Sequence, residues 1–279
     1  MRSPRLCCWL CALITLFFAA HITWGADKPA PITPSETIQL FNGKDLSSFY
    51  TWLSDLKYED PNRVFTVVDA IDGAPAIRIS GEGYGGIITK QEYTNYHLVC
   101  EFRWGNVTWA GRKDRTKDSG VLLHCQGANH EKSPWMASIE AQIIEGGTGD
   151  LLVVGGTDDK GQSLTPSCAC EITKDKDGEP VWKKGGEKQV FRGGRVNWFG
   201  RDPDWKDELG FRGKQDVESP QGQWTRLEVI ADGNTLQYLV NGVVVNEATE
   251  VSPTAGKLLF QTEGAELFFR KIELNPLKK

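Results

Sequence analysis

The sequence predicts an all-β fold, a sandwich of two antiparallel sheets, from three observations. About fourteen short apolar segments follow one another at the spacing of β-hairpins. Turn sequences such as Asp232-Gly233 and Asn241-Gly242 separate several of them, and Asn-Gly between apolar runs is among the strongest hairpin signals. No amphipathic helix pattern of about twelve residues or more interrupts the series, and no repeat period is evident.

The first half of the chain contains the clearest strand. Within residues 97–104, Leu98, Cys100, Phe102 and Trp104 fall on one face, and Val99, Glu101 and Arg103 fall on the other. This two-residue period is typical of a strand with one face in the core and the other toward solvent. Further strands are expected at residues 38–41, 64–68, 76–80, 86–90, 120–125, 138–145 and 151–154.

The last third of the chain predicts a meander that closes the sandwich. Its strands are expected at residues 224–231, 236–240, 243–246, 257–261 and 266–274. Segment 157–222, which precedes it, is rich in Asp, Lys, Gly and Arg and has too few aliphatic residues for a core of its own. We therefore expect one domain over residues 38–276, with 157–222 as a long ordered insertion that covers one side of it.

The N-terminus has the pattern of a secretory signal peptide over residues 1–25. Arg2 and Arg5 precede an apolar run from Leu6 to Ala20, which is short for a membrane span. The proline-containing stretch 26–37 is expected to be a linker. These features predict a secreted or periplasmic protein with no membrane partner beyond its leader, and the alternative is an uncleaved N-terminal anchor.

The charge of the chain without its leader limits the classes of partner it can bind, and its cysteine content limits the possible disulfides. Loss of Arg2 and Arg5 leaves 30 of the 32 basic residues against 37 acidic ones, a net charge of −7. An acidic surface argues against nucleic acid or anionic lipid and leaves neutral ligands such as sugars. The cysteines that remain are Cys100, Cys125, Cys168 and Cys170. The sequence does not choose among their pairings.

Segment 138–147 carries the residues to which we assign the function. Read as a strand, it turns Ile139 and Ala141 to one face and Glu140 and Gln142 to the other. Such a polar pair suits the floor of a groove, because sugar hydroxyls supply the partners that a dry core lacks. Glu145 has the opposite parity and reaches the same patch only if a β-bulge near residues 143–144 shifts the register. The simpler alternative is a strand on a solvated sheet face that ends in a Gly-Gly turn.

Five motifs in sequence order resemble those of the 3-keto-disaccharide hydrolase family and together cover nearly all of residues 36–276. They are Leu40-Phe41-Asn42-Gly43-Lys44-Asp45-Leu46; Ile88-Thr89-Lys90 with Tyr96-His97-Leu98 and Glu101-Phe102-Arg103; Asp118-Ser119-Gly120-Val121; Glu140-Ala141-Gln142-Ile143-Ile144-Glu145; and Phe269-Arg270-Lys271-Ile272. The resemblance implies a concanavalin A-like or laminin G-like jelly roll that acts on 3-keto-glycosides as a hydrolase, or as a 1,2-lyase and hydratase. The chain departs from the family pattern in the 157–222 insertion, at Asp118, where asparagine is usual, and at His124, where many relatives have arginine.

The expected chemistry selects three candidate catalytic residues. A ketone at C3 of a sugar acidifies the proton on C2, so cleavage requires a base, an acid and a group that polarises the ketone oxygen. Glu140 or Glu145 is the candidate base or acid. His124 is the candidate acid or polariser, because imidazole titrates near neutral pH. The alternative for His124 is a surface histidine on a sheet face.

Substrate-binding candidates are expected around these positions. Gln142 is expected to hold sugar hydroxyls, and Lys90 or Arg103 to stabilise an enolate oxygen. The remaining candidates are Asp118, Trp135, Trp198, Gln261 and Glu263. Gln261 and Glu263 alternate away from apolar neighbours, whereas Trp135 and Trp198, like Trp109 and Trp205, are loop tryptophans of the kind that stack on sugar rings. For each candidate the alternative is a solvated sheet-face charge or a packing role.

No cofactor or metal is indicated by the sequence. The chain lacks the Asp-x-Asp-x-Asp-Gly spacing of a calcium loop, although its many loop carboxylates leave room for a structural calcium. Two other functions compete with the carbohydrate-active enzyme suggested by the resemblance. One is a retaining glycosidase of the laminarinase type, whose Glu-x-Asp-x-x-Glu motif Glu140-x-Gln142-x-x-Glu145 imitates with Gln in the centre. The other is a non-catalytic carbohydrate-binding module, and the sequence leaves the sugar, the linkage and the oligomeric state open.

Overall fold

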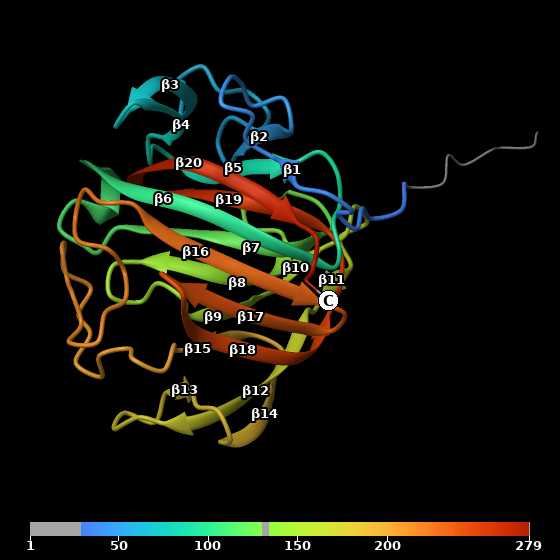
Figure 1. The fold of residues 1–279 in the computed structure, drawn as a ribbon, viewed down its shortest axis with the longest axis vertical. Coiled ribbons are helices and arrows are strands. Elements are labelled where there is room, and N and C mark those ends of the chain that lie inside the picture. Colours follow the sequence, from blue (N-terminus) through green and yellow to red (C-terminus); the bar gives the residue numbers. More distant parts are fainter. Residues whose placement is uncertain (1–28, 130–133, 279) are drawn as a thin grey trace, which may run out of the picture. The chain divides into compact units, whose positions relative to one another are not determined.

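Two antiparallel β-sheets pack face to face around a shared hydrophobic core in the computed structural model, which describes residues 29–129 and 134–278 (Figure 1). Both sheets belong to the compact unit Pro31–Lys279. The expected signal peptide, residues 1–25, and the first residues of the expected linker, 26–28, lie outside the described residues.

The larger sheet has eleven strands within the described residues. They are β1 (Ile38–Gln39), β3 (Phe65–Ile71), β4 (Ala74–Ile79), β6 (Tyr96–Thr108), β12 (Ser167–Lys174), β13 (Pro180–Trp182), β14 (Glu187–Phe191), β16 (Thr225–Asp232), β17 (Thr235–Val240), β18 (Val243–Ser252) and β20 (Ala265–Asn275). Their order across the sheet is β13-β12-β18-β17-β16-β6-β20-β4-β3, with β1 beside β20 and β14 beside β12.

The smaller sheet has seven strands in the same described part of the chain. They are β2 (Phe49–Leu53), β5 (Tyr84–Thr89), β7 (Asp118–Gln126), β8 (Ala137–Ile144), β9 (Leu151–Val154), β15 (Gly194–Val196) and β19 (Lys257–Glu263). Their order is β15-β9-β8-β7-β19-β5-β2. A separate hairpin, β10 (Gly156–Thr157) with β11 (Ser163–Leu164), and one 3-10 helix, η1 (Ala110–Arg112), complete the described elements. The fold is the predicted jelly-roll sandwich.

Alternation along the central strands decides which side chains fill the core. On β6, Leu98 and Phe102 are fully buried in the core, whereas the side chain of Arg103 points out of the larger sheet toward Asp72. On β8, Ile139 and Ile143 lie in the core. The two-residue periods predicted for both segments are confirmed, and they leave the even-numbered residues of β8 on the outer face of the smaller sheet.

The register between β7 and β8 differs from the expectation at one point. Pairing runs without interruption from Asp118 opposite Ile144 to Leu123 opposite Ile139, so the bulge expected near residues 143–144 is absent. The irregularity lies instead between Leu123 and Gln126, where His124 has a φ of 54°. A non-glycine residue in the left-handed region marks a bulge that reverses the local side-chain direction.

Segment 157–222 supplies strands to both sheets, a greater involvement than the one-sided cover expected for it. β12 pairs with β18 at the edge of the larger sheet, and β15 pairs with β9 at the edge of the smaller one. Although this segment contains few aliphatic residues, Ile172, Val196 and Trp198 join the common core. The segment therefore packs on hydrophobic residues contributed by the rest of the sandwich.

The meander of the last third forms the hairpins that its turns predict. Asn241 and Gly242 have φ values of 49° and 81° between β17 and β18. Positive φ at both central residues is the requirement of a type I′ turn, which asparagine and glycine meet with little strain. β16, β17 and β18 are consecutive neighbours in the larger sheet, where they lie between β12 and β6 (Figure 1).

No helix in the described part of the chain is long and apolar enough to cross a membrane. The four cysteines for which no pairing could be chosen, Cys100, Cys125, Cys168 and Cys170, are all buried free thiols.

Candidate active site

Four polar side chains form a patch on the outer face of the seven-stranded sheet. Glu140 and Gln142 come from β8, Asp118 from the first residue of β7, and Gln261 from β19. Asp118, expected in a loop, therefore lies on a strand. Each of the four residues is only 2–4% exposed. Buried polar side chains need hydrogen-bond or ion-pair partners, and the partners of these four residues outline the candidate site.

Gly120 makes room for two of these side chains. It lies on β7, directly opposite Gln142. A Cβ atom at this position would fall 2.2 Å from Oε1 of Glu140 and 2.6 Å from Oε1 of Gln261. Since real Cβ contacts are never this short, only glycine lets the carboxyl of Glu140 and the amide of Gln261 lie together over β7.

Glu140 has a strongly perturbed proton affinity. The pKa of its carboxyl is raised to about 8, chiefly by burial and also by the nearby charge of Asp118, whereas Arg195 and a hydrogen bond from Gln261 limit the rise. Desolvation disfavours the charged form of a carboxyl. Glu140 therefore holds a proton at neutral pH.

Asp118 is held by two donors. Nε2 of Gln142 donates to Oδ1 of Asp118 over 2.6 Å, and Nη2 of Arg112 donates to Oδ2 in a short charge-assisted contact. Burial raises the pKa of Asp118 to about 6, and the cations Arg112 and Arg195 limit the rise. At neutral pH Asp118 is therefore mainly ionised, beside a protonated Glu140.

Glu263 brings a third carboxyl to the same patch. It ends β19, and its Oε1 lies 3.9 Å from Nη2 of Arg112. Burial raises the pKa of Glu263 well above its ordinary value, with further contributions from the charges of Asp118 and Glu140. Three carboxyls this close cannot all be ionised, so they exchange protons as a group.

Arg195 supplies positive charge to the patch from the 157–222 segment. It lies on β15, with Nη1 3.8 Å from Oδ2 of the fully buried Asp150. Its cation lowers the pKa of Asp118, Glu140 and Glu263. Asp150 also accepts a short ion pair from Arg201, and its backbone carbonyl accepts the N–H of Gln142 over 3.0 Å. Arg195 is thus connected through one buried residue to the strand that carries Glu140.

The side-chain oxygen of Gln261 is available to accept a hydrogen bond from a ligand. Its Oε1 is buried and has no hydrogen-bond partner among the described residues. Buried side-chain oxygens without a partner are uncommon in folded proteins, because each costs about 1–3 kcal/mol. A ligand hydroxyl placed over Gly120 would satisfy it.

The family of the chain follows from comparison with known proteins. The model of the 3-keto-alpha-glucoside-1,2-lyase-like domain matches residues 36–275, most of the chain. The chain belongs to this family. This lyase-like domain has no significant match among curated protein sequences.

Solved structures similar to the lyase-like domain include proteins of carbohydrate metabolism. A candidate glycosyl hydrolase from Parabacteroides distasonis is 19% identical, with 87% of this chain and 94% of that chain covered and a TM-score of 0.48. A Bacillus licheniformis β-glucanase is 10% identical, with 87% and 99% covered and a TM-score of 0.42. A carbohydrate-binding module from Bacillus subtilis is 10% identical, with 75% and 91% covered and a TM-score of 0.39. These similarities are too distant to carry an argument about the site.

The lyase-like domain brings together five of the residues selected from the sequence. They are Asp118, Glu140, Gln142, Gln261 and Glu263. Arg112 and Arg195 join them but were not foreseen. Neither arginine lies in a strand pattern or a matched motif, so no local signal pointed to them.

Glu145 lies apart from this group. Without the expected bulge it keeps the parity of Ile143, and its Oε2 accepts the backbone N–H groups of Lys117 and Gly210 over 3.0 and 2.8 Å. Nζ of Lys117 lies 3.7 Å from its Oε1. Glu145 therefore ties the 157–222 segment to the end of the smaller sheet, and its position does not support the catalytic role expected for it.

His124 is a core residue and not the groove-lining acid that was expected. It is 1% exposed, its Nδ1 lies 3.0 Å from the carbonyl oxygen of Pro253, and its ring packs edge-on against Tyr96. Burial lowers its pKa to about 4, so it is neutral at physiological pH. The bulge at His124 turns its side chain inward, which strict alternation did not predict.

The expected cationic groups lie elsewhere as well. Lys90 is exposed, and its Nζ donates to the carbonyl oxygen of Ser47. Arg103 projects from the larger sheet, where it pairs with Asp72 over 2.9 Å and covers the ring of Trp224. Both match the alternative of sheet-face charges. Arg195 is instead the cation whose charge lowers the pKa of Glu140.

The tryptophans that were expected to stack on sugar rings lie in different environments. Trp198 is 1% exposed in the core and cannot stack on a sugar. Trp135 is partly buried against a small hydrophobic cluster that contains Trp52, Leu122 and Met136. Trp205 stacks against Arg201, with 4.3 Å between the guanidinium carbon and the ring centroid.

A metal site is not apparent in the described part of the lyase-like domain. No group of three or more histidine, cysteine, aspartate or glutamate side chains there has the geometry to hold an ion. The carboxyls of the patch are instead compensated by protons and by the two arginines.

Proposed function

We propose that the lyase-like domain is a carbohydrate-active enzyme that cleaves 3-keto-glycosides by removing the proton next to the ketone. The proposal is carried by one observation: a buried, protonated Glu140 beside an ionised Asp118 on the outer face of a sheet. Two carboxyls whose pKa values are pushed apart are the signature of an acid and base pair. The family match supports a carbohydrate substrate.

In the proposed elimination, Asp118 takes the proton from C2 of the keto-sugar. The C–H electrons form a C2–C3 double bond and the carbonyl electrons move to the ketone oxygen, which gives an enolate. When the carbonyl re-forms, the C2–C3 electrons become the C1–C2 double bond, and the C1–O bond breaks with its electrons on the leaving oxygen. Glu140 gives its proton to that oxygen. Each oxygen of Asp118 accepts one hydrogen bond and keeps a lone pair for this step.

Hydration completes net hydrolysis at the same pair. Glu140, now ionised, takes a proton from water, and the resulting hydroxide adds to C1 of the enone. Asp118 returns its proton to C2. Both carboxyls recover their starting states, as general acid–base catalysis requires over a full cycle.

Arg195 stabilises the enolate that forms at the ketone oxygen. A cation in a partly desolvated hollow acts on developing charge more strongly than it does in water. Gln142 orients Asp118, and the unpartnered Oε1 of Gln261 accepts a sugar hydroxyl. No cofactor is required by this sequence of steps.

We also propose that the enzyme acts outside the cytoplasm. The support is the charge and hydropathy pattern of residues 1–25, which is that of a cleavable leader. N-terminal sequencing of the mature protein from the producing cell should begin near Ala26, and a mature form that begins at Met1 would contradict export by cleavage.

An assay on oxidised and unoxidised sugars tests the proposal. Purified domain is incubated with 3-keto-maltose and with maltose, and glucose release is followed by chromatography. We expect cleavage of the keto form alone. Cleavage of maltose would favour the retaining glycosidase, and binding of both sugars without turnover would favour the binding module.

A further inference from the structure

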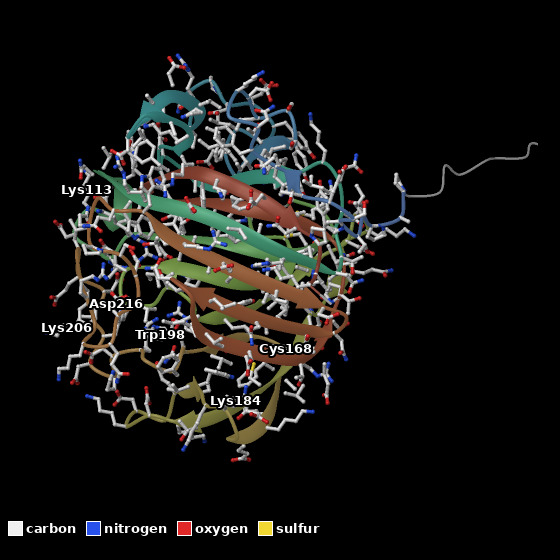
Figure 2. All side chains as sticks on the ribbon, viewed as in Figure 1. Lys113, Cys168, Lys184, Trp198, Lys206 and Asp216 are labelled. Atoms are coloured by element: carbon white, nitrogen blue, oxygen red, sulfur yellow. The ribbon has the colours of Figure 1, made fainter. Side chains whose placement is uncertain are left out.

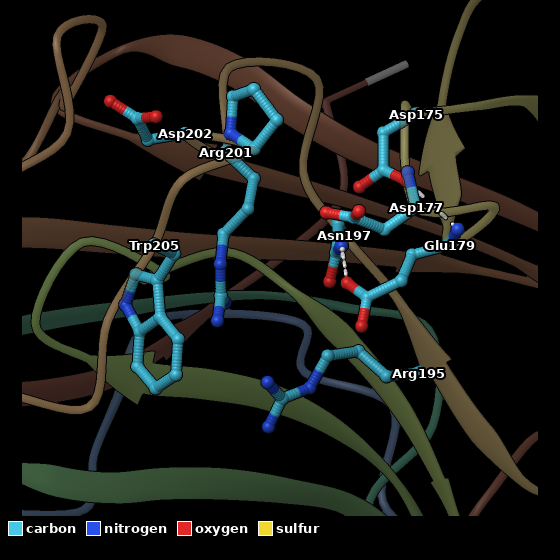
Figure 3. Close-up of a pocket in the computed structure, with 9 residues that line it drawn as sticks. Asp175, Asp177, Glu179, Arg195, Asn197, Arg201, Asp202 and Trp205 are labelled. Carbon is cyan, nitrogen blue, oxygen red and sulfur yellow. Dashed lines mark hydrogen bonds between the residues drawn. The ribbon is translucent and has the colours of Figure 1, made fainter.

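A polar hollow shares Arg195 with the proposed active site, and Figure 3 shows the residues that line it. It has a volume of about 170 Å³ and is lined by residues of the 157–222 segment: Asp175, Asp177, Glu179, Arg195, Asn197, Arg201, Asp202, Pro203 and Trp205. Pockets for drug-sized ligands measure about 300–1,000 Å³, so this one fits a single sugar ring. None of the residues that line it was assigned a role in the proton transfers except Arg195.

The hollow presents charge of both signs. Two of its four carboxylates, Asp175 and Asp202, already accept backbone N–H groups of nearby loop residues, which leaves Asp177 and Glu179 to face a ligand. Figure 3 shows the guanidinium groups of Arg195 and Arg201 on one side and the carboxylates of Asp177 and Glu179 with the amide of Asn197 on the other. An anion would meet these carboxylates, and a cation would meet the two arginines. A sugar hydroxyl both donates and accepts hydrogen bonds, so it matches both sides.

Donors remain available in the hollow. The guanidinium of Arg195 makes no hydrogen bond to another described residue, and its contact with Asp150 at 3.8 Å is too long for one. Arg201 is fixed between Asp150 and the ring of Trp205. Glu179 accepts one hydrogen bond, from Asn197 over 2.8 Å, and retains further acceptor capacity.

Arg195 connects this hollow to the three carboxyls. It lines the hollow and also lowers the pKa of Asp118, Glu140 and Glu263. A keto-sugar bound over Glu140 with its C1 turned toward β15 would place the attached sugar in this hollow.

We propose that the hollow lined by Arg195, Arg201 and Trp205 is a subsite for the leaving sugar of a disaccharide. The inference rests on the proposed function for the location of cleavage, but sugar binding in the hollow can be measured without turnover. It makes the 157–222 segment the part of the chain that distinguishes disaccharides from simple glycosides.

The test compares Asp177→Ala with a matched control, Asp204→Ala. Asp177 lines the hollow, whereas Asp204 is an exposed carboxylate of the same segment that pairs with Lys176 and is not among the lining residues. We expect Asp177→Ala to raise KM for 3-keto-maltose about tenfold, the effect of one lost hydrogen bond to a charged group. KM for methyl 3-keto-α-glucoside, which has no second sugar, should not change, and Asp204→Ala should match wild type with both substrates.

Calorimetric titration separates this inference from the proposed function. Maltose, trehalose and sucrose are titrated into wild type and into both variants, and the expected result is about tenfold weaker binding to Asp177→Ala alone. If no keto-sugar is cleaved but this loss is seen, the proposed function fails and the subsite stands. Equal kinetic effects on the two keto substrates, no effect on either, or no disaccharide binding that depends on Asp177 would overturn the subsite.

Discussion

At the residue scale, the site depends on two carboxyls that the fold keeps in different protonation states. Glu140 and Asp118 are similarly buried, but Asp118 receives donors from Arg112 and Gln142, which favour its charged form. Their pKa values of about 8 and about 6 follow from this difference. Near neutral pH the pair is ready to give one proton and to take another.

The first prediction is a bell-shaped pH profile. Activity requires ionised Asp118, so kcat/KM should rise through about pH 6, and it requires protonated Glu140, so it should fall through about pH 8. The measurement is kcat/KM for 3-keto-maltose between about pH 4.5 and pH 10. A profile that increases steadily through pH 8 would exclude Glu140 as the acid.

The second prediction concerns Glu140 itself. Glu140→Gln keeps the shape and removes the proton donor, so kcat should fall by about 10²–10⁴-fold, the usual contribution of general acid–base catalysis. The melting temperature should not fall, because a neutral amide replaces a carboxyl that is already neutral at pH 7. Glu273→Gln, on the larger sheet beside Gln39, is the control and should behave as wild type. Full activity of Glu140→Gln would remove this residue from the mechanism.

At the element scale, strand pairing places the functional side chains. The third prediction tests this at Gly120, where an added Cβ would collide with the side chains of Glu140 and Gln261. Gly120→Ala should destabilise the fold by about 1–3 kcal/mol through overpacking and should lower kcat by displacing Glu140. Gly242→Ala, in an exposed turn, is an open-space control for the kinetics. Wild-type kcat in Gly120→Ala would show that the geometry over β7 is unimportant.

Whether the sequence placed a site residue correctly depended on the regularity of the strand that carries it. The period of two placed Glu140 and Gln142 together on the outer face of β8, because that strand is regular. It failed at His124, where a bulge reverses direction, and the bulge invoked for Glu145 does not exist. Bulges depend on both partner strands, so one strand's pattern does not reveal them.

The fourth prediction concerns Glu218, which anchors the end of the 157–222 segment. Nε1 of Trp104 donates to its Oε1 over 2.7 Å, and Oγ1 of Thr148 lies 2.8 Å from its Oε2. Burial raises the pKa of Glu218 to about 8. A protonated Glu218 donates to Thr148, whose hydroxyl then donates to the carbonyl oxygen of Ile144, 3.2 Å away.

The raised pKa of Glu218 fixes the direction in which folding stability changes with pH. Between the ordinary pKa of 4.5 and about 8, folded Glu218 binds a proton that the unfolded chain has lost, so stability falls as pH rises. Glu218→Gln keeps both contacts as a neutral group. Urea unfolding at pH 5 and pH 9 should therefore show a smaller loss of stability for the variant than for wild type. An equal loss in both proteins would contradict the assignment.

At the scale of the whole molecule, the jelly roll gathers residues that are distant in sequence. Asp118, Glu140, Arg195 and Glu263 meet because β7, β8, β15 and β19 belong to one sheet, and Arg112 reaches them from η1. The fold class followed from alternating periods and turn residues, but strand order is set by long-range pairing that local patterns do not encode. Arg195 was therefore invisible in the sequence. It belongs to a segment that contributes strands to both sheets, and Cys168, Lys184, Trp198 and Lys206 of this segment lie across the lower half of Figure 2.

The central claim is that this site breaks the C–H bond next to a sugar ketone, and a C2-deuterated substrate tests it most directly. The rate of cleavage of 3-keto-maltose carrying deuterium at C2 is compared with that of the protiated sugar under single-turnover conditions. The account predicts that the deuterated sugar reacts several-fold more slowly in the wild-type protein. Equal single-turnover rates for the two sugars, together with cleavage of unoxidised maltose, would contradict it.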